Sequence, residues 1–426
     1  MSVVSSSAPT TIRCHACGAE FHQGVERCPS CGRVVTTRSA RIVLALTLLL
    51  IIAGFAFTQY FVALHRATQS SLAVRWYTRG EQAMQASLPA VAADDYRTAL
   101  TYDPANQQYR LRLAQALLAA NRLNEARAHL ISLWEEEPAD GEINLTLARL
   151  HARRGERAKA VRYYGNAING VWNEKPRARR IATRFELVYY LMQQNQRPQA
   201  EAESVALQAD GPTDPADQLR LGSLLLQLNE PARAIDAYNA VLARDPGNAQ
   251  AWLGKGQASL ALASYAEAEH AISNALEHDA KLEDARRQLE LVRELLRLDS
   301  ALRGLSLADR SRRVAEAFQV AFQRLNHCAA EQGYRFADHN PAPQPPNGNG
   351  ATPAAAPAPL QSLYATGMQK QPVATERALR KDPDALEPTM QYVFAVERAT
   401  APLCPQMEVA DRALLTLAQH ENEAVK

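Results

Sequence analysis

Four of the six cysteines in this 426-residue chain stand in two closely spaced pairs near its start. Cys14 and Cys17 form the first Cys-x-x-Cys pair, Cys28 and Cys31 form the second, and a glycine follows each pair. Such a pair makes a tight turn that directs two sulfurs at one point, and four thiolates close a tetrahedral shell around one Zn²⁺. Because no coordination position stays open, the spacing predicts a structural zinc ion bound by these four cysteines.

Two redox-active pairs or two disulfides are the alternatives to this zinc site. Redox-active pairs more often open a helix within a βαβ pattern, which the surrounding segment does not show. A segment of about 40 residues also offers too little apolar surface for a core, so a bound metal must supply the folding energy. Residues 1–41 resemble the minimal zinc ribbon at the head of bacterial membrane proteins, which implies a metal-organised head with Zn²⁺ as its cofactor.

The charge of this head argues against nucleic acid as its partner. Residues 1–41 contain five Arg and two Glu, and Zn²⁺ with four thiolates adds about −2. The remaining charge near +1 attracts phosphate weakly, and the whole chain balances 47 Lys and Arg against 45 Asp and Glu. We therefore expect a structural or protein-contacting head. A regulator that contacts nucleic acid or transcription machinery is the alternative.

The last two cysteines, Cys328 and Cys404, lie on either side of a proline-rich stretch. In an oxidising compartment a disulfide between them would contribute roughly 4 kcal/mol in the chain-entropy model. Two unlinked buried thiols are the open alternative.

Catalytic patterns are not found in the sequence. No phosphate-binding G-x-x-x-x-G-K-[ST] motif occurs, and His420-Glu421 lacks the second histidine that a zinc hydrolase needs. His327 stands next to Cys328, but adjacent residues on a helix point apart. We expect neither an enzyme nor a small-molecule substrate.

A hydrophobic run that could cross a membrane follows the head. Residues 42–64 contain no Asp, Glu, Lys, Arg or His, and as a helix these 23 residues would be about 34 Å long, enough for a bilayer. The alternatives are a buried helix of a soluble domain and a cleaved signal peptide, for which the run is too long and starts too late. We predict a single-pass membrane protein.

The flanking arginines give this span a direction. Four Arg precede the run and three follow it within the residues that count, a small bias toward a cytoplasmic N-terminus. Metal-binding thiols are also kept reduced most easily in the cytoplasm. With Arg at 40 against Lys at 7, a bacterial source is favoured. The prediction is an inner-membrane protein with a cytoplasmic head and an extracytoplasmic remainder.

From residue 73 to residue 282 the chain repeats itself. Two rows of small residues recur with steps of 34, 34, 40, 34 and 34 residues. The rows are Gly80, Ala114, Ala148, Val188, Gly222 and Gly256, and Ala92, Ala126, Ala160, Ala200, Ala234 and Ala268. Small residues at these positions allow two antiparallel helices to cross closely. Pro104, Pro138, Pro212 and Pro246 fall where a helix must end.

This pattern resembles the tetratricopeptide repeat (TPR), with large residues near positions 4, 7, 11 and 24, small ones at 8, 20 and 27, and Pro at 32. The first unit matches at Trp76, Gly80, Ala92, Tyr96, Ala99 and Pro104, whereas the fourth has Val188 at a small position. The resemblance implies a mainly α solenoid of about six repeats with a capping helix over residues 283–298, which binds other proteins.

The first helix of each TPR lines the inner surface of the solenoid, so its positions 5 and 9 predict a groove for a peptide or a helix. An equally open interpretation is that the position-5 residues only pack between neighbouring helices. The predicted groove residues are Tyr77, Leu111, Leu145, Phe185, Leu219 and Leu253 at position 5, with Gln115, Arg149, Tyr189 and Gln257 at position 9.

The remaining residues form a helical C-terminal region. Residues 307–330, 390–399 and 410–420 show helical spacing of apolar residues, and the last two segments are too short for a core of their own. The predicted organisation is a zinc ribbon (1–41), a transmembrane helix (42–64), a solenoid (73–300), a helical extension (301–338), a linker (339–360) and a C-terminal helical segment (361–426). We interpret the chain as a membrane-anchored scaffold.

Overall fold

The computed structural model describes residues 11–35, 38–336 and 354–424, which divide into two compact units, 1–176 and 177–426. The boundary falls between the third and fourth repeats, where the repeat spacing rises from 34 to 40 residues. Most of the linker predicted over 339–360 lies outside the described residues; only 354–360 belong to them.

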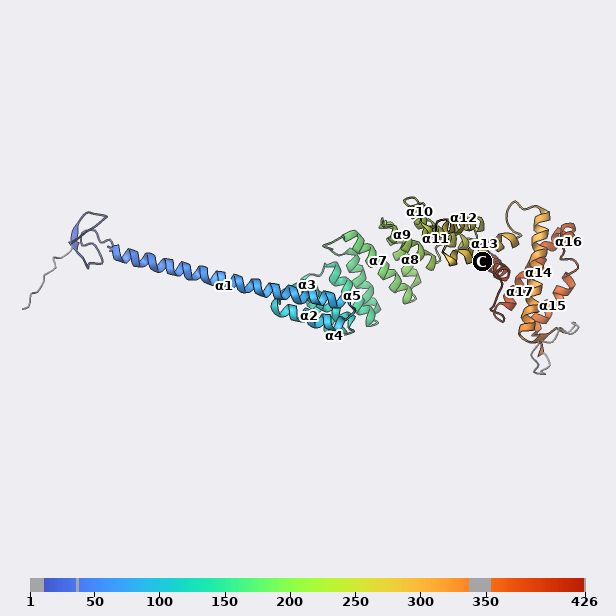
Figure 1. Cartoon of the computed structure of the whole chain (residues 1–426), viewed down its shortest axis with the longest axis horizontal. Helices are drawn as coiled ribbons and strands as arrows, with labels where there is room; N and C mark the ends of the chain where they lie inside the picture. The colour runs from blue at the N-terminus through green and yellow to red at the C-terminus, as the bar shows by residue number, and fades with distance from the viewer. Residues whose placement is uncertain (1–10, 36–37, 337–353, 425–426) are drawn as a thin grey trace, which may run out of the picture. The chain divides into compact units, whose positions relative to one another are not determined.

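The first unit begins with two short strands and one long helix. Strands β1 (Thr11–Arg13) and β2 (Glu20–His22) pair antiparallel, with Ile12 opposite Phe21. Helix α1 (Arg38–Gln85) is 48 residues long. It contains the whole apolar run and continues without a break into the first helix of the first repeat, where Figure 1 shows it beside α2.

Six helix pairs follow the predicted repeat, three in each unit, and confirm the mainly α solenoid fold. In the first unit the end of α1 pairs with α2 (Pro89–Tyr102), α3 (Gln107–Ala119) with α4 (Leu123–Glu136), and α5 (Gly141–Arg153) with α6 (Arg157–Asn169). The second unit contains α7 (Pro176–Gln193), α8 (Arg197–Ala209), α9 (Pro215–Gln227), α10 (Pro231–Leu242), α11 (Ala249–Ala261) and α12 (Tyr265–His278).

The backbone at the turn between the paired helices repeats in all six units. One residue there has a positive φ between 55° and 70°, the left-handed conformation that ends a helix and lets the chain reverse. These residues are Ser87, Asn121, Gly155, Asn195, Asn229 and Ala263. They are spaced by the same 34 and 40 residues as the small-residue rows, so the fourth repeat keeps the register of the others.

The small residues lie where an aromatic ring of the second helix presses on the first. A Cβ added to Gly80 would stand 2.6 Å from the Tyr96 ring, and one added to Gly222 would stand 2.6 Å from the Tyr238 ring. Both rings are buried. Only glycine therefore allows these two crossings without moving an aromatic side chain.

The segment that joins α6 to α7, ahead of the fourth repeat, packs within the first unit. Trp172 is buried and donates from Nε1 to the carbonyl of Ala167 at 2.9 Å. Its ring covers Gly141 at the start of α5, while the backbone of Val171 bridges that of Asp140.

The C-terminal region extends the core of the last repeat. Helix α13 (Glu283–Leu298) has the predicted bounds, and α14 (Leu307–Glu331) matches the next prediction within one residue. Then follow β3 (Tyr334–Arg335), paired in parallel with β4 (Ala354–Ala355), α15 (Ala358–Lys370), α16 (Glu376–Lys381), the 3₁₀ turn η1 (Pro383–Ala385), α17 (Leu386–Thr400) and α18 (Val409–Ala424).

These helices share one hydrophobic core with α12 and α13, as expected from their lack of an independent core. The sequence did not predict α15 and α16. Leu360 and Tyr364 of α15 are buried in this common core, and Tyr364 stacks on Phe336 with ring centroids 4.0 Å apart.

Candidate metal centre and interaction surfaces

The two cysteine pairs sit in turns with the same backbone hydrogen bonds. In the first, the N–H of Cys14 donates to Ala19 and that of Gly18 to Cys14, both at 2.8 Å. The second repeats this from Cys28 and Gly32, at 2.8 and 2.9 Å. Gly18 and Gly32 both have positive φ, which explains the glycine after each pair.

The structure brings the four predicted sulfur ligands together, all within 4.8 Å of one another. The Sγ atoms of Cys14 and Cys31 are 3.7 Å apart and those of Cys17 and Cys28 are 3.5 Å apart, and none of the four is disulfide-bonded. Tetrahedral Zn²⁺ with Zn–S bonds near 2.3 Å places its sulfurs about 3.8 Å apart. The donor set therefore fits a metal ion, and its all-thiolate chemistry favours zinc.

The electrostatics of this site also favour a bound cation. Backbone N–H groups of Ala16 and Cys17 lower the pKa of Cys14 to about 6. The N–H of Ala19 acts in the same direction on Cys17, but the thiols of Cys28 and Cys31 outweigh it and raise the pKa of Cys17 to about 12. Four thiolates at this separation repel one another, and a divalent cation removes that repulsion.

Helix α1 is long and apolar enough to cross a membrane over the predicted segment. Its most apolar 18-residue window has a mean hydropathy of 2.4, and none of that window is buried against protein. A core helix of a soluble domain would be covered on at least one face. The exposed side chains of residues 42–64 include Leu49, Ile52, Phe57 and Phe61.

In the first unit the predicted groove positions are only partly accessible. Tyr77, Leu111 and Gln115 are half-buried and Arg149 is exposed, whereas Leu145 is 7% exposed. Leu145 therefore packs between helices, as the alternative interpretation of position 5 held.

A polar network that the groove prediction missed joins the first helices of the three repeats. Arg112 lies 3.6 Å from Glu81 and 3.3 Å from Glu142, and Gln115 donates to Glu142 at 3.1 Å. Glu142 stands at position 2 of its repeat, which the TPR pattern also places on the inner surface. Arg112 stands at position 6, which the pattern does not place there. Charges of alternating sign on three neighbouring helices thus link successive repeats.

In the second unit Phe185 is fully buried and unavailable to a partner, which corrects its groove assignment. Tyr189, Leu219, Leu253 and Gln257 are half-buried. The exposed cation Arg220, which the sequence analysis did not select, lies over the Phe185 ring at 4.4 Å and the Tyr189 ring at 5.1 Å. Stacking on the rings holds the guanidinium while its edge stays accessible.

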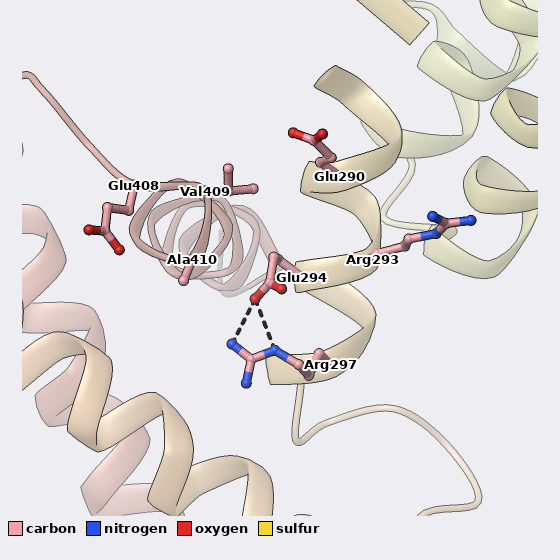
Figure 2. A pocket seen from close by; sticks show the side chains of 7 residues that line it. All are labelled: Glu290, Arg293, Glu294, Arg297, Glu408, Val409 and Ala410. Carbon is pink, nitrogen blue, oxygen red and sulfur yellow. Dashed lines mark hydrogen bonds and ion pairs between the residues drawn. The ribbon is translucent and has the colours of Figure 1, made fainter. Parts of the chain in front are cut away.

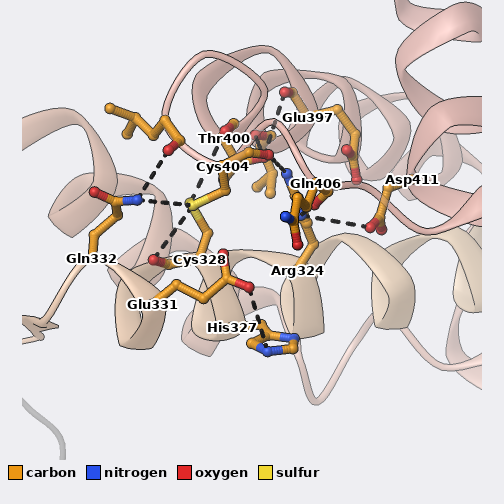
Figure 3. The surroundings of a disulfide bond; sticks show 12 residues. Arg324, His327, Cys328, Glu331, Gln332, Glu397, Thr400, Cys404, Gln406 and Asp411 are labelled. Atoms are coloured by element: carbon orange, nitrogen blue, oxygen red, sulfur yellow. Dashed lines mark hydrogen bonds and ion pairs between the residues drawn. A yellow bond between two sulfur atoms is a disulfide. The ribbon is translucent and has the colours of Figure 1, made fainter.

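Cys328 and Cys404 lie together in the second unit. Their sulfurs are 2.08 Å apart and their Cα atoms 5.8 Å apart, within the range of a disulfide. Both residues are buried, at 0% and 2% exposed. Figure 3 shows the bond between α14 and the loop after α17.

A shallow pocket lies where the start of α18 meets α13, with a volume of about 630 Å³. Figure 2 shows Glu294 of α13 bound by Arg297, which donates to it at 2.7 and 2.9 Å, with Val409 and Ala410 of α18 opposite. Arg297 also donates to Glu316 at 2.8 Å. Both arginines of the pocket are therefore held by carboxylates, Arg297 by Glu294 and Glu316 and Arg293 by Glu269 at 3.1 Å.

Two segments of the chain, residues 83–140 and 219–281, match family models of the tetratricopeptide repeat. The helix pairs are therefore TPRs. TPR proteins mediate protein–protein interactions, with stacked repeats that offer extended binding surfaces.

Cellulose synthase operon protein C of Salmonella typhimurium is 30% identical over 169 residues, which are 39% of this chain and 14% of that protein. The chain thus spans about one seventh of the length of this relative. Among solved structures, the TPR protein YrrB is 16% identical, with 46% of this chain and 98% of that chain covered and a TM-score of 0.35. The type IV pilus biogenesis factor PilW is 17% identical, with 51% and 98% covered and a TM-score of 0.38.

Proposed function

We propose that this chain is a membrane-anchored TPR adaptor that binds other proteins on one side of a membrane and carries a structural zinc ribbon on the other. The continuity of α1 carries the proposal. One uninterrupted helix of 48 residues contains the apolar run and ends as the first helix of the first repeat. With no flexible joint between residues 64 and 73, the repeats begin directly at the membrane surface.

The two kinds of cysteine support the proposed orientation. The head holds four thiols without a disulfide, whereas the second unit holds Cys328 and Cys404 at bonding distance. Reduced metal-binding thiols suit the cytoplasm, and a stable disulfide suits an oxidising compartment. The small arginine bias across the span has the same direction. We therefore propose an inner-membrane protein with a cytoplasmic N-terminus and extracytoplasmic repeats.

The proposed partner is a protein segment that contacts the inner surface of the repeats. In the second unit this surface offers Arg220 stacked on Tyr189, an arrangement that suits carboxylate or backbone oxygens of a peptide. In the first unit the half-buried Tyr77 contacts Arg112, and the half-buried Gln115 accepts a hydrogen bond from Arg112 at 2.8 Å. The relative named for cellulose synthesis is covered too little to transfer its pathway.

Recovery of partners from solubilised membranes tests this proposal. Crosslinking in cells, followed by affinity purification of the full chain, should yield partners that Tyr189→Ala and Arg220→Ala both diminish. Arg157→Ala, an exposed arginine on the second helix of a repeat, is the matched control and should leave recovery unchanged. Equal recovery from all four proteins would refute the inner surface as the binding site, and a chain found in the soluble fraction would refute the anchor.

A further inference from the structure

Two residues of α14 and the residue that caps its C-terminus, spaced four residues apart, hold the loop between α17 and α18. Arg324 donates to the carbonyl oxygens of Cys404 and, at 2.7 Å, Gln406, and one turn later Cys328 bonds to Cys404. A further turn on, Gln332 donates to the carbonyl of Leu403 at 3.0 Å. Figure 3 shows these contacts together, so the loop is tethered to α14 covalently and by hydrogen bonds.

Glu397 of α17 lies beside this tether with its side chain removed from water. Its side chain is 0% exposed, and neither carboxyl oxygen has a hydrogen-bond partner among the residues that the structure describes. The nearby charges are Arg324 of α14 and Asp411 of α18, whose ion pair spans 3.9 Å. One cation offsets one of the two acids, so an ionised Glu397 would leave a net negative charge in a dry core.

The remaining charged groups act on Glu397 only through Asp411. Glu408, at the start of α18, donates its backbone N–H to Asp411 at 3.2 Å, and His327 of α14 also acts on that carboxyl. Helix α15, which packs against α17 as well, adds no charge to this set. The balance at Glu397 is therefore set by Arg324 and Asp411.

Helix α18 is the element that this cluster positions. Its buried Leu414 and Leu417 share a core with Leu289, Val292 and Leu295 of α13, the last helix of the solenoid. A hydrogen bond of 2.8 Å between His420 and Tyr265 adds a contact to the last repeat. Figure 2 shows the start of α18 lying against α13. The apolar face of α13 is thus covered by a helix from the end of the chain.

We propose that the proton on Glu397 is a latch that keeps α18 docked on α13. Loss of this proton places two carboxylates against one arginine, and the strain is relieved when α18 moves away and lets water reach Glu397. The disulfide holds the preceding loop on α14, so opening is confined to α18 and is reversible. The inference rests on these contacts alone and does not depend on the proposed function.

The direction of the pH effect follows from linkage. Burial, and then the nearby Asp411, raise the pKa of Glu397 to about 8, against the smaller opposing effect of Arg324. Burial raises the pKa of Asp411 too. In the docked form Glu397 therefore keeps its proton. In the open form water reaches the carboxyl group, and Glu397 loses the proton above the ordinary pKa of a glutamate. Between that value and pH 8, docking weakens by about tenfold per pH unit.

Hydrogen exchange on the full-length protein in detergent, with the disulfide intact, tests the latch. Protection of residues 409–421, corrected for the intrinsic pH dependence of exchange, should fall by up to about 100-fold between pH 6 and pH 8. Residues 107–119 of α3 serve as the internal reference and should stay protected. Glu397→Gln should remove the pH dependence, while Glu387→Gln, an exposed acid on the same helix, should keep it.

A second variant keeps the test valid if Glu397→Gln fails to fold. Asp411→Asn removes the second acid, so the loss of protection should be smaller and should level off at a lower pH. The latch is overturned if the protection of residues 409–421 falls with pH as steeply in Glu397→Gln as in the unchanged protein. The same holds if the pH dependence in Asp411→Asn is unaltered. A parallel loss of protection in α3 would also overturn it, because this would report unfolding of the whole protein.

Discussion

At the scale of single residues, the repeats depend on a few positions where side-chain size is matched across two helices. Gly80 and Gly222 leave room for the buried rings of Tyr96 and Tyr238. In the fourth repeat the sizes are exchanged: Val188 replaces the small residue and Ser204 the large one, and both are fully buried. The repeat thus still pairs a small buried side chain with a larger one, which explains why it tolerates a departure from the pattern.

Gly222→Ala should lower the free energy of unfolding by about 1 to 3 kcal/mol, because the new methyl group would lie against the Tyr238 ring. Gly165→Ala is the matched control. Nothing stands within 4 Å of a Cβ at Gly165 on α6, so alanine should raise helix stability by up to about 1 kcal/mol. Urea unfolding followed by circular dichroism measures both, and equal effects of the two changes would argue against the close crossing.

At the scale of elements, two segments depend on cross-links because they bury little apolar surface. The cysteine-bearing head has a core of Phe21 and the two buried cysteines, with Ala19 and Val35 packed against them. The loop before α18 is tied to α14 by Cys404 and Arg324. In both places a bond between distant residues replaces a hydrophobic core, since short segments cannot offset their conformational entropy otherwise.

Removal of the metal should unfold the head and leave the repeats intact. Cys28→Ser removes a buried ligand, so we expect the full chain to lose one bound Zn²⁺ per molecule and the head to become sensitive to protease. Ser30→Ala, within the same turn, should retain the metal. Elemental analysis and limited proteolysis measure this. A full zinc content in Cys28→Ser would contradict the proposed ligand set.

Loss of the link between Cys328 and Cys404 should cost roughly 4 kcal/mol of unfolding free energy, because it closes a loop with a sequence separation of 76 residues. The double variant Cys328→Ala/Cys404→Ala and the chemically reduced protein should lose similar amounts in urea unfolding of the second unit. Reduction should leave the double variant unchanged. If reduction has no effect on the unaltered protein, the two thiols are not linked.

At the scale of the whole molecule, the proposed membrane anchor is continuous with the first repeat through α1. Ala73 is the ninth residue after Leu64, which corresponds to roughly 13 Å of helix. The headgroup layer occupies about 5 to 8 Å of this distance. The first repeat should therefore be held close to the membrane surface, within reach of segments of other membrane proteins.

Protease added to spheroplasts tests the orientation. The repeats should be digested while a fragment carrying the head and the span stays protected and remains in the membrane pellet. An N-terminal tag identifies this fragment, and lysed membranes, in which both sides are accessible, provide the control. Protection of the repeats together with digestion of the head in spheroplasts would reverse the proposed topology.

The amino-acid sequence alone determined the features that depend on local spacing. The cysteine pairs, the apolar run, the six repeat units and the bounds of α13 each follow from residues a few turns apart, because turn geometry and helical periodicity act over short distances. The same local information did not single out position 6 of the first helices, so Arg112 and the stacked Arg220 were missed.

Only the tertiary structure decided which distant segments meet. Whether Leu145 and Phe185 face a partner or the core depends on the neighbouring repeat, and their burial answers this for each unit. The docking of α18 on α13, and the isolation of Glu397 with Arg324 and Asp411, require the chain to return across more than 70 residues. Contacts of this kind arise from the packing of whole helices, which periodicity within one helix does not encode.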